Sequence, residues 1–269
     1  MRRNGPGQQT TVVNAQVLLT DSSLESFGSN LNVAVIGSSG GLGGALTEHL
    51  IASSRVSKVF ALSRQASPSA HIKQTSVYLD LEKSESIEAA VNTVQQFVGT
   101  LNLVIIAAGI LHDGPGMQPE RSLESITVHS LERAFRVNTI APALVAKHFL
   151  PLLVRDKKSA FAALSARVGS ISDNRLGGWH SYRASKAALN MLIRTFSIEL
   201  GRRNPSAVCV ALHPGTVDTK LSRPFQRNVP MGSLKSASES AKNLLAVLGS
   251  LSPKESGGFF AWDGSRIPY

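Results

Sequence analysis

The sequence predicts an α/β domain with a doubly wound parallel sheet of about seven strands and helices on both faces. From residue 31 onward, short apolar runs rich in β-branched residues alternate with longer amphipathic stretches, the pattern of strands joined by helical crossovers. A glycine-rich turn directly follows the first apolar run. The 269 residues are 42% hydrophobic, which is enough to bury one large core.

The periodicity of apolar residues sets the expected order of the elements. Strands are expected at 31–36, 58–62, 76–79, 101–107, 160–164, 207–212 and 258–262. Helices are expected near 42–53, 84–98, 128–150, 181–201 and 234–249. One domain over residues 31–269 is the simplest organisation.

Residues 1–30 differ in composition from the rest of the chain. They contain Arg2 and Arg3, are rich in Ser, Thr, Asn and Gln, and carry acids only at Asp21 and Glu25. We expect a flexible or loosely docked N-terminal extension, or a targeting segment that resembles a weak organellar transit peptide. The protein is accordingly expected in the cytoplasm, or in a plastid or mitochondrion if this segment directs transit.

Composition argues against several classes of function. The net charge is +10, but the basic residues form no stripe and aromatics make up only 6%, so we expect no nucleic-acid partner. The longest apolar runs are far shorter than the roughly 18 residues of a membrane span. Cys209 is the single cysteine and the seven histidines lack ligand-like spacing, so neither a disulfide nor a metal site is expected.

The glycine-rich turn after the first strand predicts a phosphate site. Residues 36–44 contain Gly37, Ser39, Gly41, Leu42 and Gly43, and a helix is expected to follow. Glycines permit a tight turn and a close approach of a pyrophosphate to backbone amides. The anion then lies at a helix N-terminus, where free N–H groups favour it, so we expect a bound dinucleotide in a Rossmann-type fold.

The ends of the next strands refine the predicted cofactor. Arg64 ends the second strand where an acid would accept the ribose 2′-OH of NAD, so NADP is favoured over NAD; the alternative is a solvated loop arginine. Asp80, followed by Leu81, ends the third strand and is a candidate for the adenine amino group, or else an N-cap for the next helix. Ala108 and Gly109 end the fourth strand and leave room for a flat ring.

Tyr182 and Lys186 form a candidate catalytic pair. They stand four residues apart in a predicted helix, so both side chains lie on one face. A cation beside a phenol favours its ionised form and lowers its pKa. The spacing therefore predicts a proton donor.

Together these motifs resemble the short-chain dehydrogenase/reductase family. The resemblance rests on the GxxxGxG spacing at 37–43, the AAG at 107–109, Asn138 in the predicted helix and the YxxxK pair. Segments 164–171, 179–190, 213–219 and 260–264 look like the C-factor and sniffer-like carbonyl reductase branch. The resemblance implies a catalytic group of Asn, Ser, Tyr and Lys in which Asn138 supports a water relay to the lysine.

The serine of that group is where this sequence departs from the family pattern. The S-x-x-G position holds Ala166, followed by Gly169. Ser165 lies one residue earlier, where strand alternation points a side chain to the opposite face. Ser170 lies 12 residues before Tyr182, just beyond the strand. Both serines remain candidates.

The same resemblance extends beyond the catalytic pair. Pro214, Gly215 and Val217 are similar to the loop that orients the nicotinamide carboxamide, and Thr219 to a diphosphate contact. Residues 221–232 look like a mobile substrate lid. The family's packing through its two long central helices implies a homodimer or homotetramer here.

The function expected from the sequence is an NADP-dependent oxidoreductase that transfers hydride between the nicotinamide and a small-molecule carbonyl or secondary alcohol. The alternative is an NAD(P)-binding signalling or regulatory protein of C-factor type with little turnover, because a fold does not determine a function.

Overall fold

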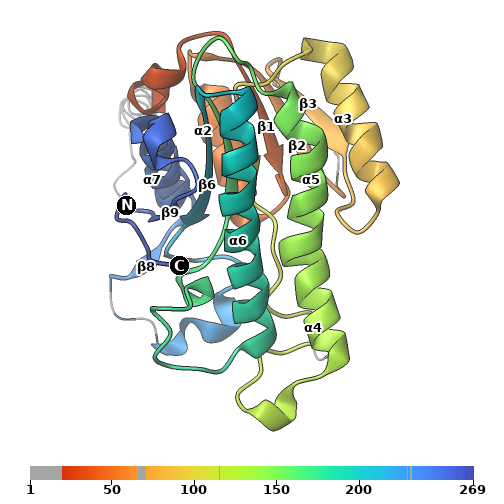
Figure 1. Ribbon diagram of the computed structural model, residues 1–269, viewed down its shortest axis with the longest axis vertical. Coiled ribbons are helices and arrows are strands. Elements are labelled where there is room, and N and C mark those ends of the chain that lie inside the picture. The colour runs from red at the N-terminus through yellow and green to blue at the C-terminus, as the bar shows by residue number, and fades with distance from the viewer. Residues whose placement is uncertain (1–19, 66–70, 115, 229, 231) are drawn as a thin grey trace, which may run out of the picture.

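A parallel sheet of seven strands forms the centre of the molecule, as the sequence predicts. The structure is a computed structural model that describes residues 20–65, 71–114, 116–228, 230 and 232–269. The strand order is β3-β2-β1-β4-β5-β6-β9 (Figure 1). In chain order the strands are β1 (Leu31–Ile36), β2 (Val56–Ser63), β3 (Gln74–Tyr78), β4 (Leu103–Ile106), β5 (Ser159–Leu164), β6 (Ala207–His213) and β9 (Phe259–Ala261).

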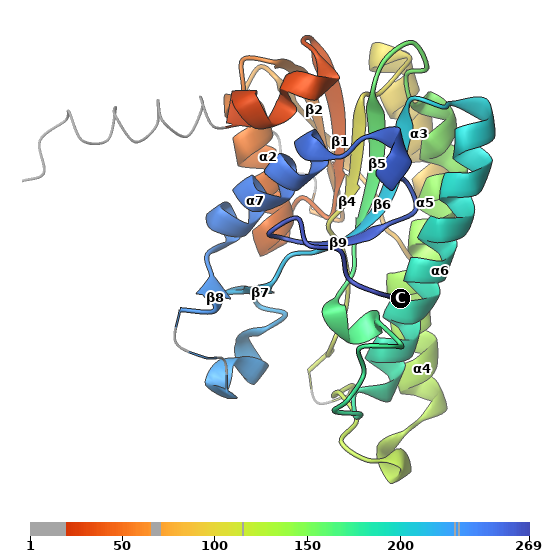
Figure 2. The same ribbon diagram turned by 60° about the vertical axis from the view of Figure 1, so that its left-hand side comes forward.

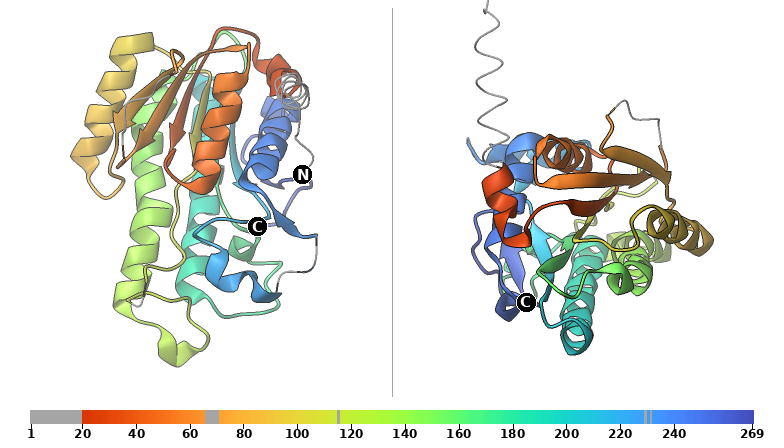
Figure 3. Two further views of the ribbon diagram at one scale, coloured as in Figure 1. Left: turned by 180° about the vertical axis from the view of Figure 1, so that it is seen from behind. Right: turned by 90° about the horizontal axis from the view of Figure 1, so that it is seen from above.

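Helices cover both faces of this sheet, so its strands are buried on both sides and read as continuous apolar runs (Figure 2). The helices are α2 (Gly41–Ala52), α3 (Ser84–Val98), α4 (Val128–Phe135), α5 (Ala141–Phe149), α6 (His180–Arg203) and α7 (Ala237–Ser250). Seen from behind, α2 and α7 lie on one face, and α3, α5 and α6 on the other (Figure 3). No helix in the described ranges is both long and apolar enough to cross a membrane.

Alternation along the strands divides the core into two. On β6, Cys209 and Ala211 join the cluster beneath α3, α5 and α6. Val208, Val210 and Leu212 point the other way and join the cluster beneath α2 and α7. Each face of the sheet therefore has its own layer of buried side chains.

The expected helix over 128–150 is interrupted. A π-helical turn, η3 (Arg136–Ile140), separates α4 from α5, and the N–H of Ala141 donates to the Arg136 carbonyl five residues back. Pro142 gives a physical reason, because it has no N–H to offer the carbonyl of Asn138 four residues earlier. The widened turn contains Asn138.

Residues 20–30 pack against the domain. They form a helical segment that ends in η1 (Glu25–Phe27), and Leu24 and Phe27 are buried in the core beneath α2 and α7. The ammonium of Lys158 lies 4.3 Å from the centre of the Phe27 ring and donates to the Gly249 carbonyl at 2.8 Å. The described part of the predicted extension is thus docked, and residues 1–19 lie outside the described residues.

A second, smaller sheet follows β6. The two-residue strands β7 (Thr216–Val217) and β8 (Leu234–Lys235) pair in parallel. This pair is not predictable from the sequence, because two residues are too few for a periodicity. It fixes both ends of the segment that includes η6 (Arg223–Asn228) and the expected lid.

Candidate active site

The functional side chains gather where the parallel strands end. All seven strands of the main sheet run in one direction, so the segments that follow β1, β4, β5 and β6 meet at one edge. In Figure 1 this edge lies below the sheet, next to the lower half of α6.

The glycine loop has the close packing that its sequence predicts. Gly37 has φ +87°, and a Cβ there would lie 2.9 Å from the amide nitrogen of Ala108. A Cβ on Gly43 would collide with the Gly37 carbonyl oxygen. The N-cap of α2 is Gly40, which offers no side chain to the first turn, so the N–H groups there are open to an anion.

Other predicted residues of the loop surround this helix start. Ser39 is exposed, and Leu42 contributes its side chain to the core while its amide lies in the first turn of α2. A Cβ on Gly41 would lie 2.9 Å from Cγ2 of Thr219, so Thr219 lies across the loop from the chain after β7. These contacts form a cradle that only small residues permit.

Arg64 follows β2 directly and is exposed. It lies beside the loop, because the carbonyl of Leu62 accepts from the amides of Gly37 and Ser38. The hydrogen bond from Arg133 lowers the pKa of Glu82 most, and the charge of Arg64 adds to that effect. Arg64 therefore lies close enough to Glu82 for their charges to interact, at the position where the sequence predicts a 2′-phosphate.

Asp80 does not cap α3. Its carboxylate accepts from the amide of Glu82 at 3.1 Å, which is an Asx turn, and the N-cap of α3 is Lys83. The N-cap interpretation of Asp80 is therefore wrong. Asp80 and Leu81 are half-buried beside the end of β3, which leaves them available to a ligand.

Tyr182 and Lys186 lie in the first two turns of α6, and both are buried, with exposed fractions of 7% and 3%. The Lys186 ammonium is 5.9 Å from the centre of the Tyr182 ring and donates to the carbonyl of Leu164 at 2.8 Å. The helical spacing thus brings the two side chains onto one face, next to the end of β5.

Burial governs the charge of this pair. It lowers the pKa of Lys186 to about 8 and raises the pKa of Tyr182 above its usual value. The shift of Tyr182 is opposite to the one expected from a neighbouring lysine alone, because burial disfavours the charged phenolate. At neutral pH the tyrosine is protonated, and so is most of the lysine.

Asn138 connects three elements of the site. Its Oδ1 accepts from the amide of Ile110 at 2.8 Å, and its Nδ2 donates to the Ile110 carbonyl at 2.8 Å and to Oγ of Ser185 at 3.1 Å. A Cβ on Gly109 would lie 3.3 Å from Asn138 Oδ1 and 3.4 Å from Lys186 Nζ. Gly109, Asn138 and Lys186 are therefore immediate neighbours, and Ala108 lies against the glycine loop.

The two candidate serines differ in what their hydroxyls do. Ser165 donates to Oδ1 of Asn190 on α6 at 2.7 Å. Ser170 accepts from the amide of Asp173 at 3.2 Å, and its own proton has no acceptor in the part of the chain that the structure describes. Neither hydroxyl bonds to Tyr182, and Ala166, at the S-x-x-G position, is half-buried.

The segment after β6 has the close packing expected of a cofactor loop. Gly215 has φ +80°, and a Cβ there would lie 3.0 Å from the indole of Trp262. The Pro214 carbonyl accepts from Ser240 at 2.8 Å, and Val217 is buried. These contacts join the loop to α7 and to the C-terminal segment.

Comparison with known proteins agrees with this geometry. A family profile described as short chain dehydrogenase matches residues 31–230. The chain belongs to the short-chain dehydrogenase family.

Similarity to individual members of this family of oxidoreductases indicates the branch that the chain resembles. The chain is 34% identical over 148 residues to the C-signal of Myxococcus xanthus, which covers 55% of this chain and 84% of that protein. It superposes on the NADPH-bound carbonyl reductase from chicken fatty liver with a TM-score of 0.77 and 31% identity, over 90% of this chain and 95% of that one. The carbonyl reductase Sniffer of D. melanogaster shares the fold, with a TM-score of 0.78 and 23% identity over 90% of this chain and all (100%) of that one. The resemblance to the C-factor and sniffer-like branch is confirmed.

The start of α6 in this short-chain dehydrogenase is held by residues that the sequence analysis missed. Trp179 has φ +51°, a left-handed conformation that costs a side chain roughly 1–2 kcal/mol. Its amide donates to the Glu120 carbonyl at 2.6 Å, and the buried Glu120 carboxylate accepts from the amide and hydroxyl of Ser181. The Gly177-Gly178 pair was the available signal, because glycines before a helix indicate a left-handed turn.

We expect Lys186 to make stability depend on pH in one window. Its pKa of about 8 lies below the ordinary value of 10.5, so between these pH values the unfolded chain binds a proton that the folded chain has lost. The free energy of unfolding therefore rises with pH there, by up to roughly 3 kcal/mol from Lys186. Lys186→Met should remove this share and leave that of Lys158, whose pKa burial also lowers to about 8. Urea unfolding at several pH values measures it. Lys147→Met, on an exposed part of α5, should behave as wild type, and an identical curve for Lys186→Met would contradict the prediction.

Proposed function

We propose that the protein is an NADP-dependent reductase that transfers hydride between the nicotinamide and a ketone, an aldehyde or a secondary alcohol. The observation that carries the proposal is the buried pair of Tyr182 and Lys186 beside Gly109, at the edge where the glycine cradle opens. The similarity to a carbonyl reductase that binds NADPH supports it.

The residues at this edge fit the cofactor. The amides at the start of α2, together with Thr219, suit the diphosphate, and Arg64 suits a 2′-phosphate. Asp80 and Leu81 border the place for adenine, Ala108 and Gly109 for a flat ring, and the loop 214–217 for a carboxamide. When bound, NADPH supplies the hydride.

Tyr182 has the properties of the proton donor. Its raised pKa keeps the phenol protonated, so it can give a proton to a carbonyl oxygen as negative charge develops there. The Lys186 ammonium on the same helix face stabilises the phenolate that remains. Burial strengthens this attraction, because little water screens it.

Asn138 and Ser170 complete the proposed group. Pro142 leaves the backbone carbonyl of Asn138 without its usual helical donor, so that carbonyl is a suitable site for a water that relays protons to Lys186. Ser170 is the better of the two serines for the substrate carbonyl, because the proton of Ser165 already goes to Asn190.

A second candidate is a dinucleotide-binding regulator with little turnover. Ala166 favours it, because the S-x-x-G position has no hydroxyl to orient a carbonyl, and the chain is similar to the C-signal of Myxococcus xanthus. Tight binding of NADPH without turnover of any ketone or aldehyde would select this candidate over the first.

Removal of the Tyr182 hydroxyl should remove the reaction and leave the cofactor bound. We expect Tyr182→Phe to lower kcat for carbonyl reduction by roughly 10²–10⁴-fold, the usual contribution of a general acid. NADPH oxidation measures turnover, and the quenching of protein fluorescence measures binding. Tyr78→Phe is the matched control, because this tyrosine is 52% exposed. Unchanged turnover in Tyr182→Phe would refute its role as the acid.

Reversal of the charge at position 64 should separate the two cofactors. Arg64→Asp is expected to weaken NADPH binding by at least roughly tenfold, because a carboxylate repels the 2′-phosphate and can accept from a 2′-OH. NADH affinity should stay level or improve, which makes it the internal control. Titration with each nucleotide measures both values, and an equal loss for the two would argue against the 2′-phosphate contact.

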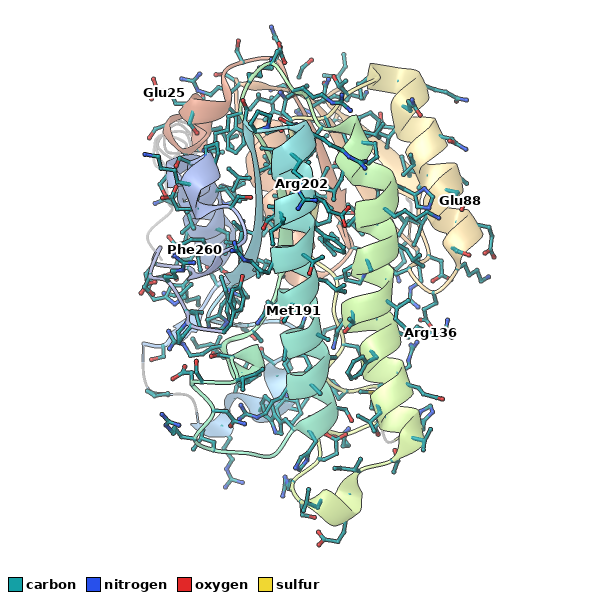
Figure 4. The ribbon with its side chains drawn as sticks, viewed as in Figure 1. Glu25, Glu88, Arg136, Met191, Arg202 and Phe260 are labelled. Carbon is teal, nitrogen blue, oxygen red and sulfur yellow. The ribbon has the colours of Figure 1, made fainter. Side chains whose placement is uncertain are left out.

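We propose that two copies associate through α5 and α6. Met191 and Ile198 on α6 are 66% and 47% exposed, and Met191 projects from the outer side of the helix in Figure 4. Exposed apolar side chains of this size are suited to an interface between copies. Sedimentation velocity should give a dimer or a tetramer for the wild type and a monomer for Met191→Asp/Ile198→Asp. A wild-type monomer would refute the assembly.

A further inference from the structure

A left-handed turn immediately precedes the catalytic pair. Gly177, Gly178 and Trp179 have φ values of +63°, +64° and +51°. Glycine adopts this conformation freely, whereas an indole-bearing residue does so only where its surroundings hold it. The turn determines the direction in which the Trp179 side chain leaves the backbone.

Two charged residues hold this turn. The Arg183 side chain donates to the carbonyls of Gly177 and Gly178 at 3.1 and 2.9 Å. The backbone carbonyl of Glu120 accepts from the amide of Trp179. The Glu120 carboxylate also occupies the N-terminus of α6, where it is favoured by the free amides. The backbone at Trp179 is therefore fixed from both sides, one turn before Tyr182.

The Trp179 ring lies between Tyr182 and the expected lid. Its centre is 6.3 Å from that of the Tyr182 ring at 72°, and 5.3 Å from that of Phe225 in η6 at 59°. Phe225 in turn meets His112, with 5.7 Å between ring centres. These are favourable tilted and edge-to-face arrangements of aromatic rings.

The rings of Trp179 and Phe225 line a cavity of about 580 Å³. Gln118, Arg121 and Thr127 lie on its other walls, and Tyr182 does not line it. Trp179 thus contacts Tyr182 and also borders the cavity, which makes the Trp179–Phe225 pair a wall between the two.

We propose that Trp179 and Phe225 are specificity-determining residues that limit the size of the carbonyl substrate. The inference rests on the proposed reductase function, in which the substrate carbonyl meets Tyr182. With the rings in contact, a compact substrate fits at Tyr182. A longer substrate has to part the rings so that its remote end can enter the cavity.

Two methyl ketones of different size test this inference. Trp179→Gly keeps the left-handed backbone, because glycine accepts that φ, and removes the ring. We expect it to raise kcat/KM for 2-acetylnaphthalene relative to butanone by at least about tenfold, with NADPH affinity unchanged. Phe225→Ala should act in the same way. Leu176→Ala, in the same loop and 91% exposed, is the control and should leave the ratio as in wild type.

The double variant provides the sharper criterion. Since both rings belong to one wall, Trp179→Gly/Phe225→Ala should show little more than the effect of either change alone. An unchanged ratio in the single variants, or effects that multiply in the double variant, would overturn the proposal.

Tryptophan fluorescence separates this inference from the proposed activity. The chain has two tryptophans, so Trp262→Phe leaves Trp179 as the reporter. In that background Phe225→Ala should shift the emission to the red, because the indole loses its cover; no shift would refute the ring contact. If neither ketone nor any other carbonyl is reduced while the emission does shift, the reductase function fails and the wall itself stands.

Discussion

The site depends on the hydrogen bonds made by the side-chain amide of Asn138. It bonds the backbone of Ile110 after β4 on one side and the hydroxyl of Ser185 on α6 on the other. Asn138 is fully buried, so each of these bonds would be costly to lose. The π-helical turn that displays the amide exists where Pro142 interrupts the helical pattern. The Asn138 side chain thus holds together three elements: its own π-helical turn η3, the segment after β4, and α6, which carries Tyr182.

Burial then decides the protonation states of Tyr182 and Lys186. Tyr182 and Lys186 are both removed from water, which raises the pKa of the phenol and lowers that of the ammonium to about 8. A pair on a solvated helix would have neither property. The chemistry proposed for the pair therefore depends on the packing of α6 against β6 and the end of β5 as much as on the four-residue spacing.

Backbone conformation places the remaining parts of the site. Close approach of the chain at Gly37 and Gly43 shapes the cradle, and a held left-handed turn directs Trp179 toward the Tyr182 ring. Gly37 approaches the end of β4 and the Trp179 amide meets the Glu120 carbonyl, both far away in the sequence, whereas Gly43 meets Gly37 within the loop itself. The two regions are held in different ways: the cradle by the absence of side chains, and the turn by the Arg183 side chain and the backbone carbonyl of Glu120.

The sequence by itself determined the order of strands and helices, the glycine cradle and the Tyr182–Lys186 face, because each depends on local periodicity, on conformational freedom or on helical spacing. Only the tertiary structure decided which serine has an uncommitted proton, that Asp80 forms a turn and does not cap α3, that Asn138 lies in a π-helical turn, and that Phe225 meets Trp179. Pro142 and the Gly177-Gly178 pair were visible signals of a break and a turn, but their consequences depend on distant partners. Local sequence pattern specifies whether a segment forms a strand, a helix or a turn. Hydrogen bonds and contacts between distant segments fix the position of each side chain, and residue spacing does not encode those contacts.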